Sequence, residues 1–382
     1  MSTSTINSDN SEEFVDLSGN ILKNKYLILT KIGSGTFSYV WLAFRIDTKS
    51  YNAIKITKSD TYDDGEFELE NFKRLRKIDS KYIISLKEHF EIESEEGTHI
   101  CMVFDLMAGS VFELIKQGTY KNGLPYTYVN NIVSQVSRGL NDLHTKIKMV
   151  HSDIKPENIL VKGQNNYTKK LINAFECSNI MSMLKKKNKS LRNIKNKLEQ
   201  IFTTIDETDD TEDIIDLSCL KNLRVVISDF GNCYLLKEGS NDVIQSREYR
   251  APEVILGAKY NERIDIWSLG CVIYELLTGE ILFDAEKKRR LNKSRAQLNM
   301  IESTIGLIPN NVKKYATRYE LFYKKNGLLK GRNKIIPSPL QDRLKKEALH
   351  LNKEEFDLAI SMLSKCLTID MSLRPQSHIF YS

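Results

Sequence analysis

Alternating apolar and polar residues predict strands in the N-terminal part of the chain. The first strand runs into a turn that contains Gly33 and Gly35, and one of its faces carries Tyr26, Ile28, Thr30 and Ile32. A second strand is expected to leave this turn. Short apolar runs over residues 51–58 and 98–104 predict two further strands.

Two later segments change to helical spacing. Residues 65–78 (GEFELENFKRLRKI) place Leu69, Phe72 and Leu75 at helical intervals. A longer stripe with a 3.6-residue period is formed by Val129, Ile132, Val133, Val136, Leu140 and Leu143. Because this stripe is entirely apolar, its helix is expected to belong to the core.

Composition fits a folded chain without identifying its function. The 382 residues are 41% apolar and 28% charged, which suffices for one large two-lobed domain or for two smaller ones. The formal net charge of +6 permits acidic partners but does not require them over so long a chain. A nucleic-acid binder would need this charge gathered on one face, so no direct nucleic-acid partner is expected.

Cysteine spacing and the N-terminus set expectations about the compartment. Six cysteines without close pairing or ligand spacing indicate neither a zinc site nor a disulfide framework: Cys101, Cys177, Cys219, Cys233, Cys271 and Cys366. We expect a reducing intracellular compartment, cytoplasmic or nuclear, in a host cell if the source is a virus. The N-terminal run MSTSTINSDNSEEFVD is polar and lacks a basic start followed by an apolar stretch, so a disordered tail is expected there. No segment elsewhere has the apolar length of a membrane span, so no membrane partner is expected.

The most informative chemistry lies in HSDIKPENIL (151–160) and, far downstream, SDFGN (228–232). These runs supply the groups of a Mg-ATP phosphotransferase in the required order. Asp153 is placed to accept the proton of an attacking hydroxyl, and Lys155 can neutralise the transferred phosphoryl group. Asn158 and Asp229 can hold the metal ions. DFG alone would be weak evidence, but the long run is specific.

The glycine turn fits a phosphate site, although a bare hairpin would explain its glycines equally well. A backbone that packs over phosphates needs glycine and free N–H groups. Lys55 favours the phosphate site, because it lies in an apolar strand where its ammonium needs a partner such as ATP phosphate. The candidate nucleotide residues are then Ile32, Gly33, Ser34, Gly35, Thr36, Phe37, Ser38, Tyr39, Val40 and Lys55.

A carboxylate partner for Lys55 should come from the helix over 65–78, which carries Glu68 and Glu70. Spacing favours Glu68, because the apolar stripe recurs beside it, and Glu70 is the alternative. The glutamate that does not pair with Lys55 is expected to belong to a solvated acidic face of the helix. His144 and His151 are expected to be structural, since Asp153 already fills the role of proton acceptor.

Further motifs carry a family resemblance: GSGTFSYVW (33–41), AIK (53–55), THICMVFD (98–105), DFGN (229–232), QSREYRAPEV (245–254) and DIWSLG (265–270). The chain resembles protein kinases of the CMGC group, and most of all the SR-protein kinases that phosphorylate serines in arginine-serine repeats. Ser38 stands in place of the usual third glycine. Kinases of the neighbouring dual-specificity type are the nearest competitors.

The resemblance implies an α+β, bilobal protein kinase fold. It comprises a tail over 1–25, a small β-rich N-lobe with one helix over 26–107, and a larger, mainly helical C-lobe over 108–382. A charged spacer over 163–221 interrupts the C-lobe. ATP and Mg²⁺ are the implied cofactors, and the substrate is a serine or threonine hydroxyl of a protein. Backbone groups around Asp105 and Met107 would bind adenine beside Phe104, and the enzyme is expected to be a monomer.

The spacer changes from basic to acidic along its length. Its basic residues include Lys185, Lys186, Lys187, Lys189, Arg192, Lys195 and Lys197, and its acidic run includes Asp206, Glu207, Asp209, Asp210, Glu212 and Asp213. Such blocks are usually solvated and flexible, with a docking or nuclear-address role as the sharper hypothesis. Short helices near 171–183 and 214–220, at the two ends, are expected to fold back on the lobes. A pseudokinase scaffold that binds partners through this spacer is the alternative function. It would be expected to lose Lys55, Asp153 or Asp229, and none is lost.

The activation segment predicts constitutive activity. Many kinases carry an arginine before the catalytic Asp that binds an activating phosphate, and Ser152 stands there instead. Ser240 and Ser246 are the only hydroxyl amino acids other than tyrosine between Asp229 and Glu253. The resemblance gives Ser246 the role of bracing Asp153 and Lys155. Asp265 and Arg374 are expected to be buried structural supports.

Substrate charge is left open. SR-protein kinases bind arginine-rich segments in an acidic groove beyond the DIWS helix, but the matching region here (285–299) is basic. Its cations would repel arginine repeats and favour acidic or phosphorylated partners, unless the loop is simply solvated. They are Lys287, Lys288, Arg289, Arg290, Lys293 and Arg295.

Overall fold

The computed structural model describes residues 16–116, 119–185, 190–205, 215, 222–237, 243–285, 292–331 and 336–381. The chain divides into two compact units, and each is described by itself. The first unit comprises Met1–Gly65, Lys87–Asp105 and Leu171–Asp206. The second comprises Glu66–Leu86, Leu106–Lys170 and Glu207–Ser382.

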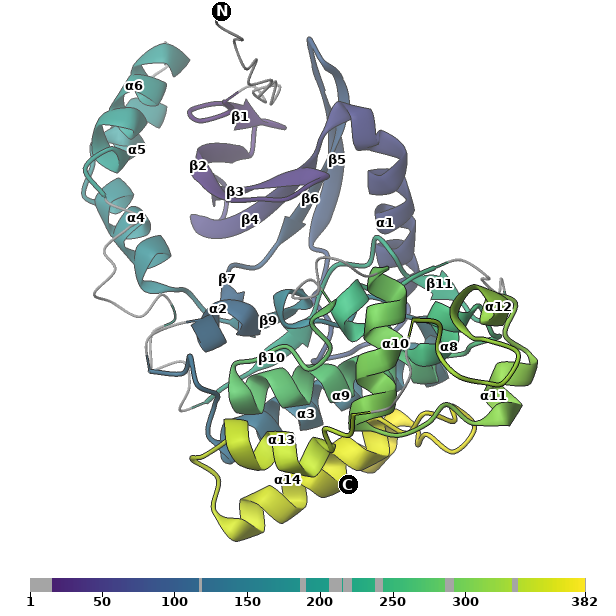
Figure 1. The fold of residues 1–382 in the computed structure, drawn as a ribbon. Coiled ribbons are helices and arrows are strands. Elements are labelled where there is room, and N and C mark those ends of the chain that lie inside the picture. The colour runs from purple at the N-terminus through teal and green to yellow at the C-terminus, as the bar shows by residue number, and fades with distance from the viewer. Residues whose placement is uncertain are drawn as a thin grey trace, which may run out of the picture. The chain divides into compact units, whose positions relative to one another are not determined.

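A six-stranded antiparallel sheet forms the centre of the first unit (Figure 1). Its strands are β1 (Ile21–Leu22), β2 (Tyr26–Ser34), β3 (Ser38–Arg45), β4 (Ser50–Thr57), β5 (Glu88–Ser94) and β6 (Gly97–Phe104), followed in the order β1-β2-β3-β4-β6-β5 across the sheet. The short 3-10 helix η1 (Ser59–Thr61) follows β4. The strands predicted from Tyr26 and over 51–58 and 98–104 are thus confirmed as β2, β4 and β6.

Both faces of β2 are buried, which the alternating pattern did not predict. Tyr26 and Ile28 belong to the hydrophobic cluster on one face of the sheet. Leu27 is fully buried as well and is paired in register with Phe44 of β3. The Phe44 ring lies 5.1 Å from the ring of Phe175, which comes from the insert. A segment distant in sequence therefore covers the second face.

Ordered structure begins before Tyr26. The expectation of a disordered tail over 1–25 is wrong for its last residues, because β1 pairs with β2 and Leu17 and Leu22 are buried in the sheet cluster. Residues 1–15 lie outside the described part. Two separate leucines give no periodic signal, so the sequence did not reveal this strand.

Within the described residues of the insert expected over 163–221, helices form as α4 (Asn166–Glu176), α5 (Ile180–Leu184) and α6 (Leu191–Phe202). Helices α4 and α5 lie where a short helix was predicted near residues 171–183, whereas the one predicted near 214–220 falls almost entirely outside the described residues. The expectation of a solvated, flexible block is wrong for α6. Its N-terminus is capped by the Ser190 side chain, which accepts from the Asn193 amide at 3.4 Å, and its inner face buries Ile194 and Leu198. Residues 186–189 and 206–214 of the charged runs lie outside the described residues.

The insert is bonded to the sheet of the first unit at several points. The Tyr51 hydroxyl donates to Glu176 at 3.0 Å, and Lys195 Nζ lies 2.9 Å from Asp16 Oδ2. Gly19 has a φ of +82°, and a Cβ there would lie 2.8 Å from the Lys195 Cα. Only glycine permits this approach, so α6 packs directly on the backbone that precedes β1.

The second unit is mainly helical. Its elements around the catalytic residues are α1 (Tyr62–Leu75, from Glu66 onward), α2 (Val111–Lys116), α3 (Tyr126–Asn141), the π-helix η2 (Asp142–Ile147), and the 3-10 helices η3 (Pro156–Asn158) and η4 (Arg247–Tyr249). Short strands are β7 (Met107–Ser110), β8 (Met149–Val150), β9 (Ile159–Lys162), β10 (Val225–Ile227) and β11 (Tyr234–Leu235). The remaining helices are α8 (Pro252–Leu256), α9 (Arg263–Thr278), α10 (Lys293–Thr304), α11 (Asn310–Lys314), α12 (Tyr319–Phe322), α13 (Leu340–Glu347), α14 (Lys353–Cys366) and η6 (Ser377–Phe380).

Helices α3 and α9 form the core of this unit, with α13 and α14 packed beside α9 (Figure 1). The predicted apolar stripe is confirmed, since all of its members are buried in α3 and η2. Helix α9 is buried from Ile264 to Thr278. Among the described residues, no helix has the length and apolar character that crossing a bilayer requires.

Replacing Phe175 with alanine is expected to reduce the free energy of unfolding by about 3–5 kcal/mol, because the buried ring leaves a cavity against Phe44 and Tyr51. Urea unfolding measures the change. The control is Leu191→Ala, since Leu191 is exposed on the same insert. Equal stability of the two variants would show that the insert contributes nothing to the first unit.

Candidate active site

The loop from His151 to Asn158 lies between β8 and β9, and a buried carboxylate holds its backbone. Asp265 of α9 accepts hydrogen bonds from the His151 amide at 2.9 Å and from the Ser152 amide at 2.8 Å. His144 Nε2 lies 2.8 Å from the same carboxylate. Ser152 has a left-handed φ of +64°, a strained conformation that these bonds stabilise. The structural roles predicted for Asp265 and His144 are confirmed.

Asp153 lies at the centre of a hydrogen-bonded group. Its Oδ1 accepts from Ser246 Oγ at 2.6 Å and from the Ser246 amide at 3.2 Å. Its Oδ2 accepts from Lys155 Nζ at 2.7 Å and from Asn158 Nδ2 at 3.1 Å. Lys155 Nζ also donates to Ser246 Oγ at 3.3 Å. Ser246 therefore braces Asp153 and Lys155, as predicted.

This group keeps Asp153 ionised. Burial by itself would raise the pKa of Asp153, but the hydrogen bonds from Lys155 and Ser246 outweigh it and hold the pKa below its usual value. Burial would likewise lower the pKa of Lys155, and the contact with Asp153 outweighs that effect and raises it. An anionic acceptor and a cation thus lie side by side at neutral pH.

Pairing of β9 with β10 brings the two proposed metal ligands together. Ile159 pairs with Ile227, so the residues flanking these strands, Asn158 and Asp229, are neighbours in space. The Ser228 amide donates to the Asn158 carbonyl at 2.9 Å, which fixes this arrangement. Asp229 has a left-handed φ of +64°.

The donors at this place fit Mg²⁺. Asn158 Nδ2 donates to the Asp153 carbonyl at 2.8 Å and to its carboxylate, which leaves the amide oxygen for a cation. Asp229 offers a carboxylate, and Mg²⁺ prefers oxygen ligands from one or two side chains together with substrate phosphates. No cluster of three or more His, Cys, Asp or Glu side chains suited to a metal occurs within the described residues.

Phe230 of the DFG run is packed inward. It is fully buried, with ring centroids 5.3 Å from Phe72 of α1 and 5.3 Å from His151. Asn71 Nδ2 donates to the Phe230 carbonyl at 2.9 Å. Packing of this phenylalanine decides whether the neighbouring aspartate faces the metal site. Sequence reasoning missed Asn71, although a buried amide on the apolar face of a helix was a signal.

The glycine turn and Lys55 lie in the first unit. The turn joins β2 to β3, with the Gly35 amide donating to the Ser38 carbonyl at 2.8 Å, and Phe37 at its tip is 54% exposed. Lys55 lies in β4, in register with Val40 of β3. The remaining turn residues Ile32, Gly33, Ser34, Thr36 and Tyr39 belong to β2, β3 or the link between them.

Glu68 and Glu70 have different surroundings. Glu68 is 4% exposed on α1. Glu70 is solvent-exposed and forms an ion pair with Lys73 at 2.6 Å, which lowers the pKa of Glu70. Glu70 therefore fits the interpretation of a solvated helix face. The contrast in burial favours Glu68 as the candidate partner of Lys55.

The residues proposed to contact adenine fall in both units. Asp105 follows β6 in the first unit and pairs with Lys87 at 2.9 Å, and the preceding Phe104 is buried. Met107 is the first residue of β7 in the second unit. Their role toward a nucleotide stays a prediction.

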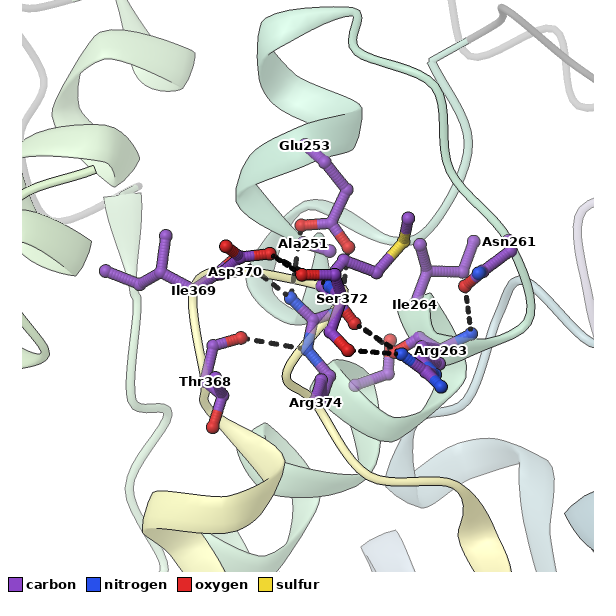
Figure 2. Close-up of polar contacts among 12 residues, drawn as sticks. Ala251, Glu253, Asn261, Arg263, Ile264, Thr368, Ile369, Asp370, Ser372 and Arg374 are labelled. Carbon is purple, nitrogen blue, oxygen red and sulfur yellow. Dashed lines mark hydrogen bonds and ion pairs between the residues drawn. The ribbon is translucent and has the colours of Figure 1, made fainter. Parts of the chain in front are cut away.

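An ion pair fixes the end of the activation segment (Figure 2). Glu253 of α8 accepts from Arg374 in two bonds, at 2.7 and 3.2 Å, and both side chains are buried. Arg374 also donates to the Thr368 carbonyl at 3.0 Å. The predicted structural role of Arg374 is confirmed. A bidentate pair of this kind is geometrically specific, and removing one partner would leave a buried charge.

Gln245 fixes the same segment from within. It has a left-handed φ of +68°, and its Nε2 donates to Ser268 Oγ at 2.7 Å. Its Oε1 accepts from the Ala251 amide at 3.0 Å. Sequence reasoning missed Gln245, because nothing in its spacing indicates burial. Ser240 of this segment lies outside the described residues.

Comparison with known proteins agrees with this geometry. The model of the protein kinase domain matches residues 26–201 and 215–380. A putative serine/threonine-protein kinase of Acanthamoeba polyphaga mimivirus is 29% identical, covering 93% of this chain and 86% of that protein. The serine/threonine-protein kinase SRPK of Physarum polycephalum is 32% identical, covering 93% and 84%. The protein kinase dsk1 of Schizosaccharomyces pombe is 26% identical, covering 92% and 78%. The chain therefore belongs to the protein kinase family, as a serine/threonine kinase of the CMGC group similar to the SR-protein kinases.

Proposed function

We propose that this serine/threonine kinase is constitutively active, uses Mg-ATP, and prefers hydroxyls that have a basic side chain nearby. The observation that carries the proposal is the group around Asp153, in which an ionised carboxylate, a lysine and a bracing serine are already assembled. Such a preorganised group supplies general-base catalysis without a further conformational step.

Each residue of this group has a role in transfer. Asp153 orients the substrate hydroxyl and accepts its proton, and Lys155 neutralises charge on the transferred group. ATP would supply the phosphoryl group, and Mg²⁺ would neutralise part of its negative charge. In this proposal Asn158 and Asp229 hold the metal, while the glycine turn and Lys55 bind the phosphates. A scaffold without turnover is not supported, because these residues are present and the relatives carry kinase names.

Asp153→Asn is expected to lower kcat about 10²–10⁴-fold, because the amide cannot accept the proton. Transfer of labelled phosphate from Mg-ATP to a serine peptide measures the loss, and ATP binding should persist. Asp357→Asn, an exposed residue on α14, is the matched control. Unchanged turnover in the Asp153 variant would refute the assignment of the base.

A group of carboxylates beside the catalytic loop supports a basic substrate. Glu157 is exposed, and its pKa is raised by partial loss of hydration and by repulsion from Asp153 and Glu113. Glu275 is buried on α9 and accepts from the Tyr249 hydroxyl at 2.6 Å. Burial raises the pKa of Glu275 to about 7, with Glu157 and Glu248 adding repulsion. A substrate cation would relieve this repulsion, whereas an acidic residue would increase it.

Glu157→Gln is expected to raise KM about tenfold for a serine peptide with arginine near the acceptor and to leave an alanine counterpart unchanged. Because the pKa of Glu157 is raised, acidification should protonate it above the usual range of glutamate. KM for the arginine peptide should therefore rise as pH falls, and fall as Glu275 ionises above about 7. Steady-state kinetics between pH 5.5 and 8.5 test both. Equal changes for the two peptides would contradict the proposal.

Internal contacts support activity without a modification. Gln245 and the Glu253–Arg374 pair hold the end of the activation segment, and Ser152 Oγ donates to the Asn232 carbonyl at 2.6 Å where an arginine would otherwise bind phosphate.

The described cysteines, which include Cys101, Cys233, Cys271 and Cys366, are free thiols, and this supports a reducing intracellular compartment.

Phosphatase treatment of the purified enzyme is expected to leave at least half of its turnover, because no phosphate is needed to hold the activation segment. Mass spectrometry verifies complete dephosphorylation before the assay. Gln245→Ala should reduce turnover in treated and untreated samples alike, since it loosens the segment itself. Loss of activity on treatment, with recovery after incubation with Mg-ATP, would instead indicate activation by phosphorylation.

A further inference from the structure

Two adjoining hollows flank helix α11 in the second unit. The α11 hollow has a volume of about 780 Å³ and mostly apolar walls, which include Ala258, Val312, Tyr315, Ile369 and Met371, with Lys259 at its margin. The α12 hollow has a volume of about 680 Å³ and is lined by Lys313, Lys314, Tyr319 and Leu321, with one carboxylate, Glu320, among the other residues. Thr317 lines both. We propose that these hollows form a docking site for an acidic protein segment that carries a bulky apolar side chain.

The walls of the hollows are fixed by backbone contacts. Gly257 ends α8 with a φ of +66°, and its carbonyl accepts from Thr317 Oγ1 at 2.9 Å. The Arg318 amide donates to the Leu256 carbonyl at 2.9 Å. On the opposite wall, Asp370 accepts from Ser372 Oγ at 2.6 Å and also from Asn311. The hollows are therefore built features that hold their shape without a partner.

Apolar side chains are exposed beside these walls. Tyr315 is 67% exposed and Leu321 is 66% exposed. Each has apolar surface that a partner could remove from water, at a gain of roughly 25 cal/mol per Å². An occupant with a leucine, phenylalanine or similar side chain would fill the α11 hollow and cover Tyr315.

Positive charge is concentrated on the same stretch. Residues 310–331 contain six lysine or arginine residues and one glutamate, a net charge of +5 compared with +6 for the entire chain. Lys313 and Lys314 lie over the rings of Tyr323 and Tyr315, at 4.7 and 5.4 Å. Neither they nor Lys259 pairs with a carboxylate within the residues that the structure describes. Carboxylates of a partner could form ion pairs with Lys259, Lys313 and Lys314.

A protein segment fits better than a nucleic acid. Single-stranded nucleic acid binds through bases that stack on open aromatic faces. Tyr319 and Tyr323 already stack on each other, with centroids 4.9 Å apart, and Lys313 lies over the ring of Tyr323. What stays open is an apolar hollow bordered by lysines, which suits a side chain and its neighbouring carboxylates.

The docking site is distinct from the carboxylates beside Asp153. It adjoins α8, directly after the activation segment. Glu253 also lines the α11 hollow, but its carboxylate is already paired with Arg374. Binding at the two hollows needs neither ATP nor turnover, so it can be measured independently of the proposed substrate preference. The Asp153→Asn variant is expected to bind the same segment unchanged.

Fluorescence anisotropy with the full chain tests the site. The probe is a fluorescein-labelled 12-residue peptide of glutamates around a central Leu-Phe pair, compared with a version with serines at the centre and one with lysines for glutamates. The glutamate peptide with Leu-Phe is expected to bind about tenfold more tightly than either. Lys313→Glu with Lys314→Glu should weaken it about tenfold, and Val312→Trp should remove the advantage of the Leu-Phe pair by filling the hollow.

The matched control is Lys324→Glu with Lys325→Glu, which makes the same charge change on exposed lysines that line neither hollow. This variant should change binding less than threefold, and thermal melting verifies that all variants are folded. Equal weakening by the two double variants would overturn the site in favour of unspecific attraction. Equal binding of the serine peptide, tighter binding of a 12-nucleotide single strand, or no binding of any acidic peptide would overturn it as well.

Discussion

The carboxylate of Asp265 is the interaction on which the catalytic loop depends. It is fully buried in α9 and receives the amides of His151 and Ser152 together with His144 Nε2. Hydrogen bonds to a charged group contribute about 1.5–3 kcal/mol each, enough to hold Ser152 in its left-handed conformation. That conformation directs the next residue, Asp153, toward Lys155 and Ser246. The arrangement around Asp153 thus depends on a buried carboxylate on another element of the fold.

Charge is divided between two parts of the second unit. Carboxylates of Glu157 and Glu275 gather beside the catalytic loop, whereas Lys259, Lys313 and Lys314 border the hollows at α11. The small net charge of the chain conceals this division. These lysines are not the basic loop predicted over 285–299, whose residues 286–291 lie outside the part of the chain that the structure describes.

The insert is as much a part of the β-sheet unit as the strands are. Phe175 covers the face of the sheet that carries Phe44, and Lys195 packs against Gly19. Its basic and acidic runs predicted a solvated, flexible middle, with short helices expected only at the two ends. A few apolar residues at helical spacing, among them Ile194 and Leu198, instead stabilise an ordered helix. Burying them offsets the entropy of ordering the segment.

The sequence by itself determined the family, and it predicted the candidate catalytic residues and several elements. Motif order predicted roles for Asp153, Lys155, Asn158 and Asp229. Local periodicity identified β2 and α3, since it depends on neighbours along the chain. Only the tertiary structure showed that Glu68 is buried while Glu70 is exposed, and placed Gln245 and Asn71 in the interior. The physical reason is that burial and electrostatic coupling arise between residues far apart in sequence, for which a single chain carries no periodic signal.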